Sequence, residues 1–243
     1  MQQIELSLSE PADHLALDEA LLLAADANGI GETIRTWAFG SPTVVVGRSS
    51  RVDIEVDRTL CDREGIPILR RCSGGASIVG GPGCLMYSVI LSLVGQPELR
   101  KIDAAHRYVM QRVLAALQNQ IPKVAFQGTS DLTWENRKFS GNSLRISRQH
   151  LLYHGTVLHQ SDLDLIGRCL LHAPRQPDYR KGRNHQEFVT NLPIDPIQLT
   201  VDLVHQFQAT AMEADGNAIA TIQTAMGQLR RDRYDDPAWH FRH

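Results

Sequence analysis

The sequence lacks any uninterrupted run of about eighteen apolar residues, so it predicts no helix that spans a bilayer. Its first residues, MQQIELSLSEPAD, lack the basic segment and apolar core of a secretory signal. Only four cysteines occur, and no two of them form a CxxC pair. This pattern argues against a zinc site and against a disulfide framework. The expectation is therefore a cytoplasmic protein with reduced thiols and no membrane partner.

An excess of charge of one sign is also lacking. The chain has 25 Lys and Arg against 27 Asp and Glu, which gives a formal net charge of −2. That balance provides no global attraction to nucleic acid, which is not expected as a partner. Apolar residues make up 42% of the sequence and charged residues 21%, as in ordinary folded proteins. A chain of 243 residues could form one large domain or two small ones.

Helical and strand patterns alternate along the chain. Apolar residues at helical spacing predict helices over residues 13–27, 53–64, 103–118, 162–171, 199–211 and 219–231. Apolar and β-branched runs predict strands over residues 33–37, 43–46, 67–70, 84–93, 131–134, 138–146 and 151–159. Short polar turns join the last three strands, which indicates an antiparallel meander. The predicted fold class is therefore α+β, with helices packed on a mixed sheet.

Residues 70–84 read RRCSGGASIVGGPGC and combine positive charge with a flexible backbone. Glycines let N–H groups converge on an anion, and arginines supply forked donors to phosphate or carboxylate. The loop matches neither a Walker motif nor GxGxxG. Taken alone, it favours a plain reading, a tight connection between strands with two solvated arginines.

A second small polar turn surrounds Lys138, in the sequence RKFSGNS. Strand alternation predicts that Lys138 and Ser140 point to one face and Phe139 to the other. If the first face lines a cleft, Lys138 presents a compact positive charge to a phosphate or a developing oxyanion. The plain alternative is a solvated strand lysine. Likewise, His154 lies in an apolar run, where a buried structural histidine is the plain alternative.

The order of these motifs resembles the lipoate–protein ligase family. The similarity extends over about residues 12–193 and rests on LALDEAL (15–21), TVVVGRS (43–49), RRCSGGA (70–76), SDL (130–132), RKFSGNS (137–143), HGTVL (154–158) and VTNL (189–192). The superfamily also contains octanoyltransferases and, more distantly, biotin–protein ligases. The resemblance implies a single catalytic domain over residues 1–243, with a mixed, largely antiparallel sheet. It also implies the attachment of a lipoyl or octanoyl group to a lysine of an acceptor domain, of the 2-oxoacid dehydrogenase or glycine cleavage type.

The resemblance assigns roles to particular residues. ATP and lipoate would condense to lipoyl-adenylate, and Lys138 would stabilise the charge at the α-phosphate and the acyl carbonyl. The acid and phosphate end would be bound by Arg70, Arg71, Ser73, Gly74, Gly75 and Ala76. Nucleotide and its Mg²⁺ would be held by Ser130, Asp131, Gly141, Asn142 and Ser143, with Asp131 as the metal candidate. The carbonyl end of the acyl tunnel would be closed by His154, Gly155 and Thr156. The apolar tail would lie against residues 15–27 and 44–46, and no prosthetic group is expected.

Two features leave the choice of enzyme open. Full-length bacterial ligases of this family have a C-terminal accessory domain, or a separate small subunit, that is not expected within residues 1–243. An octanoyltransferase needs neither ATP nor that domain, because it takes octanoyl from acyl carrier protein through a cysteine thioester. The candidate nucleophiles are Cys72, whose pKa could be lowered by two adjacent arginines, and Cys169. The preferred reading is that Cys72 is a bystander and Cys169 a buried structural thiol. Neither lies in a transferase motif, so the ligase is preferred and the transferase is the alternative.

A third alternative is a family member that only binds lipoyl or acyl groups without catalysis. The presence of Lys138 and Arg70 argues against it, because a pure binding module has little use for an oxyanion donor. Acceptor domains of this kind tend to be acidic, which would suit exposed arginines between Arg175 and Arg183.

Overall fold

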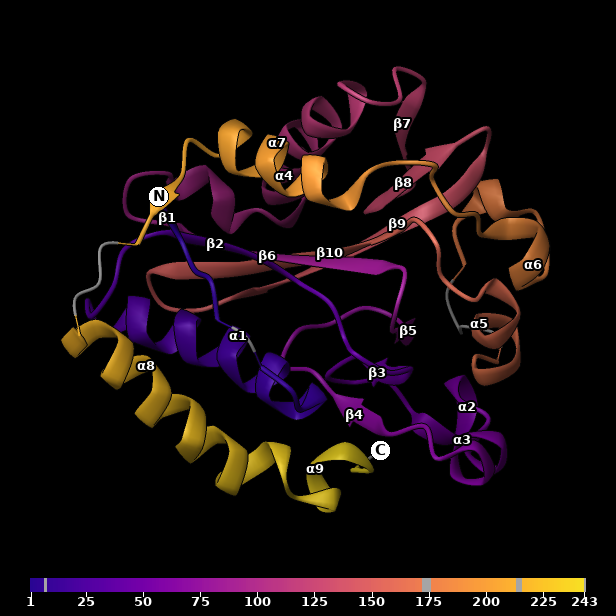
Figure 1. The fold of residues 1–243 in the computed structure, drawn as a ribbon, viewed down its shortest axis with the longest axis horizontal. Coiled ribbons are helices and arrows are strands. Elements are labelled where there is room, and N and C mark those ends of the chain that lie inside the picture. The colour runs from indigo at the N-terminus through magenta and orange to yellow at the C-terminus, as the bar shows by residue number, and fades with distance from the viewer. Residues whose placement is uncertain (7, 172–175, 213–215, 243) are drawn as a thin grey trace.

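The computed structural model describes residues 1–243 apart from positions 7, 172–175, 213–215 and 243. A large mixed sheet of eight strands and a small sheet of three strands organise the fold (Figure 1). In spatial order, the large sheet contains β11 (Thr210–Ala211), β1 (Gln2–Gln3), β2 (Thr33–Trp37), β6 (Cys84–Ser92), β10 (His150–Leu158), β9 (Arg137–Ile146), β8 (Asp131–Trp134) and β7 (Val124–Gln127). The pairs β11–β1 and β1–β2 are parallel, and the other neighbouring pairs are antiparallel. The predicted α+β class and the antiparallel meander β8–β9–β10 are therefore confirmed.

In the small sheet, β3 (Thr43–Val46) lies between β4 (Ile68–Arg70), which is parallel to it, and β5 (Ile78–Gly80), which is antiparallel. The helices are α1 (Pro11–Asp26), α2 (Val52–Glu55), α3 (Arg58–Glu64), α4 (Ile102–Gln118), α5 (Leu163–Cys169), α6 (His185–Phe188), α7 (Pro196–Gln206), α8 (Gly216–Leu229) and α9 (Pro237–His240). Single 3₁₀ turns occur at Pro97–Arg100 and Asp178–Arg180, and a π-helical turn occurs at Arg230–Tyr234. None of the described helices combines the length and the apolar character that crossing a membrane requires.

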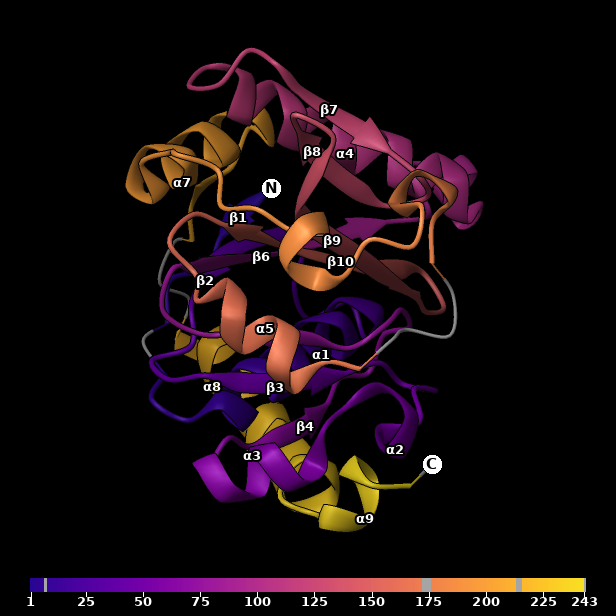
Figure 2. The same cartoon turned by 90° about the vertical axis from the view of Figure 1, so that its right-hand side faces the viewer.

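Helices cover both faces of the large sheet. α4 and α7 pack together on one face, while α1 packs against β6 and β10 on the other face, with α8 outside it (Figure 1). Figure 2 shows that the small sheet lies on the same side of the large sheet as α1. The large sheet and the small sheet therefore face each other on the α1 side. The glycine loop after β4 and the motif around Lys138 come together between them.

α1 is a buried helix that carries two acidic side chains. Pro11 stands in its first turn, where a missing backbone N–H costs little. Its leucines and alanines pack against the sheet, and Asp18 and Glu19 are each only 1% exposed. A carboxylate that is removed from water needs charged or hydrogen-bonding partners. Both acids find such partners on distant elements, as described below.

Several predicted boundaries are corrected. The helix expected over residues 53–64 is two helices, because Val56 adopts an extended backbone (φ −130°, ψ 134°) and bridges to Leu170. Asp57 then caps α3 by accepting a hydrogen bond from Leu60 N at 2.9 Å. The helix expected to continue to residue 231 ends as α8 at Leu229 and passes into the π-helical turn. β5 and β7 were not predicted, because such short strands show little periodicity.

A β-bulge in β9 changes the face to which Lys138 points. Leu132 pairs with Ser140 and Thr133 pairs with Lys138, so Phe139 is an extra residue in the strand. Leu132 and Thr133 are consecutive in β8 and point to opposite faces of the sheet, so their partners Ser140 and Lys138 also point to opposite faces. The prediction that Lys138 and Ser140 share a face is therefore wrong. Lys138 instead shares its side of the sheet with Gly141, whose Cβ position would lie 3.0 Å from Lys138 Nζ. Bulges often redirect a side chain in this way beside an active site.

Candidate active site

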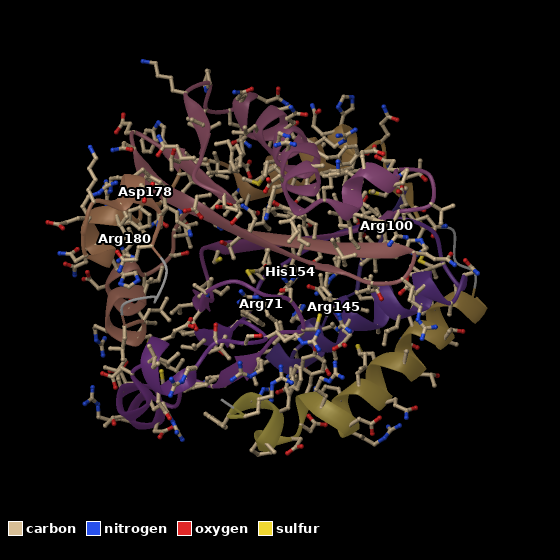
Figure 3. The ribbon with its side chains drawn as sticks, turned by 180° about the vertical axis from the view of Figure 1, so that it is seen from behind. Arg71, Arg100, Arg145, His154, Asp178 and Arg180 are labelled. Atoms are coloured by element: carbon tan, nitrogen blue, oxygen red, sulfur yellow. The ribbon has the colours of Figure 1, made fainter. Side chains whose placement is uncertain are left out.

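A cavity of about 330 Å³ lies between the large sheet and the loop that leads into β5. Its apolar side is formed by Leu15, Trp37, Val45, Ile78 and Met86. Most of the predicted site residues line it, namely Arg71, Gly75, Ala76, Ser130, Asp131, Lys138, Gly141, Asn142, Ser143, His154, Gly155 and Thr156. The predicted residues Arg70, Ser73 and Gly74 are not among those that line it. In Figure 3, Arg71 and His154 lie close together between the large sheet and the elements of the α1 side.

Lys138 brings a partly exposed ammonium group to the cavity wall. Its Nζ lies 2.7 Å from Asp131 Oδ1, and its side chain is 29% exposed. Tyr179 Oη donates a hydrogen bond to the other oxygen, Asp131 Oδ2, at 2.7 Å. Burial and the Asp131 carboxylate raise the pKa of Tyr179, which keeps it a donor at neutral pH. An ammonium group has three N–H donors, so Lys138 can contact Asp131 and still donate to an anion in the cavity.

Arg71 shapes the glycine loop. Its guanidinium donates to Val45 O at 3.1 Å, Ala76 O at 2.9 Å and Gly74 O. Burial lowers the pKa of Arg71 to about 10, so it keeps its charge at neutral pH. Gly75 has φ +82°, and a Cβ there would lie 2.9 Å from Arg71 Nη2, so this position requires glycine. Ala76 is not among the residues with positive φ, which explains why alanine is tolerated beside two glycines.

Arg70 lies elsewhere, although its neighbour Arg71 lines the cavity. Its side chain is fully buried and its guanidinium donates to Gly47 O at 2.7 Å, Ser50 O at 2.8 Å and His240 O at 2.8 Å. Burial is the main cause that lowers its pKa. Consecutive strand residues point in opposite directions, so a pair of adjacent arginines cannot both enter one cavity from the end of β4. Of the two arginines expected around the acid, only Arg71 lines the cavity.

His154 belongs to a buried chain of hydrogen bonds. Asp18 Oδ1 accepts from Arg35 Nε at 2.9 Å, while Asp18 Oδ2 lies 3.0 Å from His154 Nδ1 and accepts from Ser88 Oγ at 2.9 Å. His154 Nε2 lies 2.6 Å from Ser73 Oγ. Arg35, together with hydrogen bonds from its neighbours, lowers the pKa of Asp18 against the opposing effect of burial. An ionised carboxylate can only accept, so the His154 ring directs an Nδ1–H at Asp18.

Sequence reasoning did not assign Asp18 or Arg35 to the site. The signal was present, because Asp18 and Glu19 interrupt an otherwise apolar helical run. Such acids are buried only when a partner compensates them, and the partner of Asp18 is Arg35 on β2, 17 residues along the chain. Glu19 is held by Arg145 Nη1 at 2.5 Å and by Tyr234 Oη at 2.7 Å.

Gly155 leaves room for Asn142. These two residues are partners across β10 and β9, and Tyr87 on β6 is the partner of Gly155 on its other side. A Cβ at Gly155 would overlap Asn142 Oδ1 and lie 2.8 Å from Tyr87 Cε1. The Asn142 amide nitrogen donates to Ser130 O at 2.9 Å and to Ser140 Oγ at 3.1 Å, while its oxygen accepts from Tyr87. The amide is therefore held in one orientation at the cavity wall.

The cysteines do not provide a nucleophile in this conformation. All four are described and buried, and none of them lines the cavity. Burial raises the pKa of Cys72 to about 12, so the adjacent arginines do not produce the lowering considered above. Burial also raises the pKa of Cys169 to about 12, in a contact with Cys61. Neither thiol would form a useful fraction of thiolate at neutral pH.

A smaller cavity of about 130 Å³ adjoins the first around Lys138, Gly141 and Thr156. Its other walls are mainly apolar and include Leu158, Ile166, Leu170, Phe188 and Val189. Within the described residues, no group of three or more His, Cys, Asp and Glu side chains is placed to hold a metal ion. Asp131 is the only carboxylate among the described residues that line either cavity, so a metal would have to arrive with its own ligands, as it does in Mg-ATP.

The expected row of exposed arginines is also corrected. Arg180 is only 4% exposed, stacks on Phe188 with its guanidinium carbon 4.7 Å from the ring centre, and donates to Arg183 O at 2.8 Å. Arg175 lies outside the described residues. Lys181 is exposed, so it remains available to a partner.

The fold and the cavity together define a known class of catalytic domain. Residues 10–212 match the family of lipoyl protein ligase A/B catalytic domains, and the chain belongs to this family. It is 29% identical to the probable lipoate-protein ligase A of Mycoplasma genitalium, over 66% of this chain and 46% of that protein. It thus spans about half the length of this relative. The octanoyltransferase LipM of Geobacillus kaustophilus is 25% identical over 98% of this chain and 97% of its own.

Solved structures show the same fold. One of them is a bi-partite lipoate protein ligase, described with its E2 lipoyl domain, from Thermoplasma acidophilum. It superposes with a TM-score of 0.79 at 17% identity and covers 99% of this chain and 95% of that chain.

Proposed function

We propose that residues 1–243 form the catalytic domain of a lipoate–protein ligase-type enzyme, which makes an acyl-adenylate from ATP and lipoate. The acyl group then passes to a lysine of a lipoyl acceptor domain. The observation that carries the proposal is the cavity itself, which brings the Lys138 ammonium and the Arg71 guanidinium to an apolar wall and contains no thiol. Family membership supports the same class of reaction.

The first step joins two anions, so it needs positive charge. A carboxylate oxygen of the acid attacks the α-phosphorus of ATP, and the bond to pyrophosphate breaks. Lys138 offers a compact ammonium that can contact both anions, and the charge of Arg71 adds to the positive potential of the same wall. Fixed charges in a site shielded from water stabilise such a transition state without having to reorganise. Asp131 would be the residue that holds the Mg²⁺ of Mg-ATP, and the ion would offset the negative charge of the phosphates.

The second step transfers the acyl group. The acceptor lysine attacks the acyl carbonyl carbon as a neutral amine, and the carbonyl oxygen becomes an oxyanion. AMP then leaves with the bonding electrons, and the nitrogen releases one proton to solvent as the amide forms. Lys138 is the donor proposed for that oxyanion. The acyl tail would lie against Leu15, Val45 and Met86, the apolar side of the larger cavity. Its volume falls within the ordinary range for small-molecule sites, about 300–1,000 Å³.

The partner proposed for this step is a lipoyl acceptor domain of the 2-oxoacid dehydrogenase or glycine cleavage type. The likeness in fold to a bi-partite ligase described with an E2 lipoyl domain supports that class of partner. It also supports an accessory subunit as a further partner, which would be needed if adenylation proves incomplete with this chain alone.

An octanoyltransferase that draws on acyl carrier protein is the second candidate. It is favoured by the match to octanoyltransferase LipM, which extends over nearly the whole of both chains. The burial of all four thiols weighs against it, because a thioester intermediate would need a thiol that reaches the cavity.

The deciding experiment is the intact mass of a purified lipoyl acceptor domain after incubation with this protein. One sample contains ATP, Mg²⁺ and lipoate, a second contains octanoyl-acyl carrier protein, and a third contains preformed lipoyl-adenylate. A control acceptor domain has its target lysine replaced by arginine. The ligase predicts a lipoyl mass shift in the first and third samples only.

Each other outcome has its own meaning. A shift in the third sample alone shows that transfer is intact and that adenylation needs a further subunit. A shift in the second sample alone replaces the proposal by the octanoyltransferase. If no sample gives a shift, the chain is a non-catalytic binder and the proposal fails.

A further inference from the structure

The C-terminal segment, residues 230–242, folds back onto β4, the strand that ends at Arg70. The segment lies beyond residues 10–212, the part that matches the family. Figure 1 shows α9 next to β4, at the edge of the fold where the chain ends in the picture. None of the side chains of residues 230–242 lines either cavity. Any effect of this segment on the reaction must therefore act through the residues that it holds.

Arg70 is held on both its backbone and its side chain. Its N–H donates to His240 Nδ1 at 2.9 Å, and its carbonyl accepts from Trp239 Nε1 at 2.8 Å. Its guanidinium donates to the carbonyls of the same two residues, with Nε 3.0 Å from Trp239 O and Nη2 2.8 Å from His240 O. The remaining guanidinium nitrogen, Nη1, donates to Gly47 O and Ser50 O. The His240 imidazole and the Trp239 indole thus pair with the backbone groups of Arg70 as a neighbouring strand would.

This arrangement requires one protonation state of His240. Nδ1 accepts the Arg70 N–H, so it carries no proton, and Nε2 then donates to Tyr234 O at 3.0 Å. A second proton on Nδ1 would face the Arg70 N–H and stand close to its charged guanidinium. Burial is the largest cause that lowers the pKa of His240, and Arg70 lowers it further, while the hydrogen bond to Tyr234 O and the carboxylates of Asp235 and Asp236 oppose this. The neutral form is therefore the form that fits.

The other end of the segment is anchored to α1. Tyr234 is 1% exposed and donates to Glu19 Oε2 at 2.7 Å, and Arg233 pairs with the same carboxylate. Trp239 packs edge-on against Tyr234, with ring centres 6.3 Å apart. The segment therefore bridges α1 and β4.

A short path of hydrogen bonds connects Arg70 to the cavity wall. The turn formed by residues 47–50 accepts hydrogen bonds from Arg70 through three of its carbonyls, those of Gly47, Arg48 and Ser50. Within that turn, Arg48 donates its N–H to Ser73 O at 2.7 Å. The Ser50 hydroxyl donates to Gly75 O at 3.2 Å. The glycine loop, residues 71–75, is thus held in place by the turn that Arg70 holds. Its position sets where the charge of Arg71 stands at the cavity wall.

We propose that Trp239 and neutral His240 form a clamp on Arg70 that positions the 71–75 loop for binding the carboxylic acid substrate. In this view Arg70, Trp239 and His240 are positioning residues, and none of them touches substrate. The clamp itself is a property of the folded chain. Only its kinetic consequence, an altered KM for the acid, rests on the function proposed above.

The kinetic test compares three variants over about pH 8 to about pH 5.5. His240→Asn keeps an acceptor, Oδ1, near the place of Nδ1 but does not titrate. His240→Phe removes the acceptor and leaves the Arg70 N–H unpaired, so KM for the acid should rise about tenfold at about pH 8. Phe241→Ala is the matched control, because Phe241 is 40% exposed and stacks on Arg58 instead.

We expect KM for the acid to rise in the wild type and in Phe241→Ala only as the pH falls below 6.5, the ordinary histidine value, while His240→Asn holds its KM nearly constant. kcat should change less than KM in every case, because the clamp acts on binding. Two results would overturn the clamp. One is a KM for the acid that is unchanged in folded His240→Phe. The other is a KM of His240→Asn that rises at low pH as much as that of the wild type.

A second measurement is independent of any activity. Long-range ¹H–¹⁵N spectra of the histidine rings report the tautomer and the pKa of each ring, and the His240 signal is identified by its loss in His240→Asn. The clamp predicts the Nε2–H tautomer and a pKa below the ordinary value of 6.5. A Nδ1–H tautomer, or a pKa at or above that value, refutes the clamp even if the enzyme proves to be active. If instead the wild type modifies no acceptor while the ring shows the expected tautomer, the proposed function fails and the clamp stands.

Discussion

Replacing Asp18 by asparagine tests the buried network that supports His154. The Asp18 carboxylate is 1% exposed and accepts from Arg35 Nε at 2.9 Å, from Ser88 Oγ at 2.9 Å and from His154 Nδ1 at 3.0 Å. Arg35 is itself only 3% exposed. Asn has almost the same shape as Asp, so Asp18→Asn leaves no cavity and changes mainly the charge. It leaves the Arg35 cation buried without its counter-ion.

The magnitude follows from that uncompensated charge. Removing one partner of a buried ion pair costs about 3–5 kcal/mol, and a domain is usually stable by only about 5–15 kcal/mol. Asp18→Asn should therefore lose a large part of the free energy of unfolding at neutral pH. Denaturant unfolding followed by circular dichroism measures this loss directly.

A double variant separates charge from packing. Replacing both members, as Asp18→Leu with Arg35→Met, removes the buried charges together, and such replacements of a whole pair are often neutral or stabilising. We therefore expect the double variant to be more stable than Asp18→Asn. If Asp18→Asn lies within about 1 kcal/mol of the wild type, or the double variant is no more stable than the single one, the charge argument is refuted.

The same variant carries a pH signature. The pKa of Asp18 is lowered in the folded protein, so the unfolded state takes up the proton first as the pH falls. Its contribution to stability is thus complete above the ordinary carboxyl pKa of 3.8 and is lost as the pH falls through the folded pKa. The stability difference between the wild type and Asp18→Asn should shrink in acid. A difference that stays constant down to the acid transition would contradict this.

Three further changes probe the cavity. Lys138→Met should lower kcat/KM by about 10²–10³ at unchanged thermal stability, and near-normal turnover would remove Lys138 from the mechanism. Gly155→Ala should destabilise the protein by about 1–3 kcal/mol, because its Cβ would displace the amide of Asn142. Denaturant unfolding checks this, and wild-type stability would show that the strands adjust freely. Cys72→Ala should keep its turnover, because this thiol is buried with a pKa of about 12. A folded but inactive Cys72→Ala would instead favour the octanoyltransferase.

Much of the fold was predictable because secondary structure leaves a local pattern. The strands at residues 33–37, 43–46 and 131–134 were expected with the bounds that the structure has. The order of motifs around Lys138 and the glycine loop also predicted which segments meet at the cavity. Most of the predicted lining residues lie at the cavity, because the residues of a short motif are neighbours in the chain and their strand brings them to the same place in the fold.

Other features could not be read from local pattern. The bulge at Phe139 reverses the face of Lys138 relative to Ser140, because register depends on how β9 pairs with β8. The raised pKa of Cys72 follows from its burial, which the neighbouring arginines in the sequence do not reveal.

By itself, the sequence determined the α+β class, the helices and strands long enough to show a period, and the motifs that place this chain in its family. Tertiary structure alone decided which buried charge meets which partner. Arg71 enters the cavity while Arg70 turns away to His240, 170 residues along the chain. The reason is physical. Periodicity is a property of neighbouring residues, whereas the pairing of buried polar groups depends on which distant elements the packed core brings together.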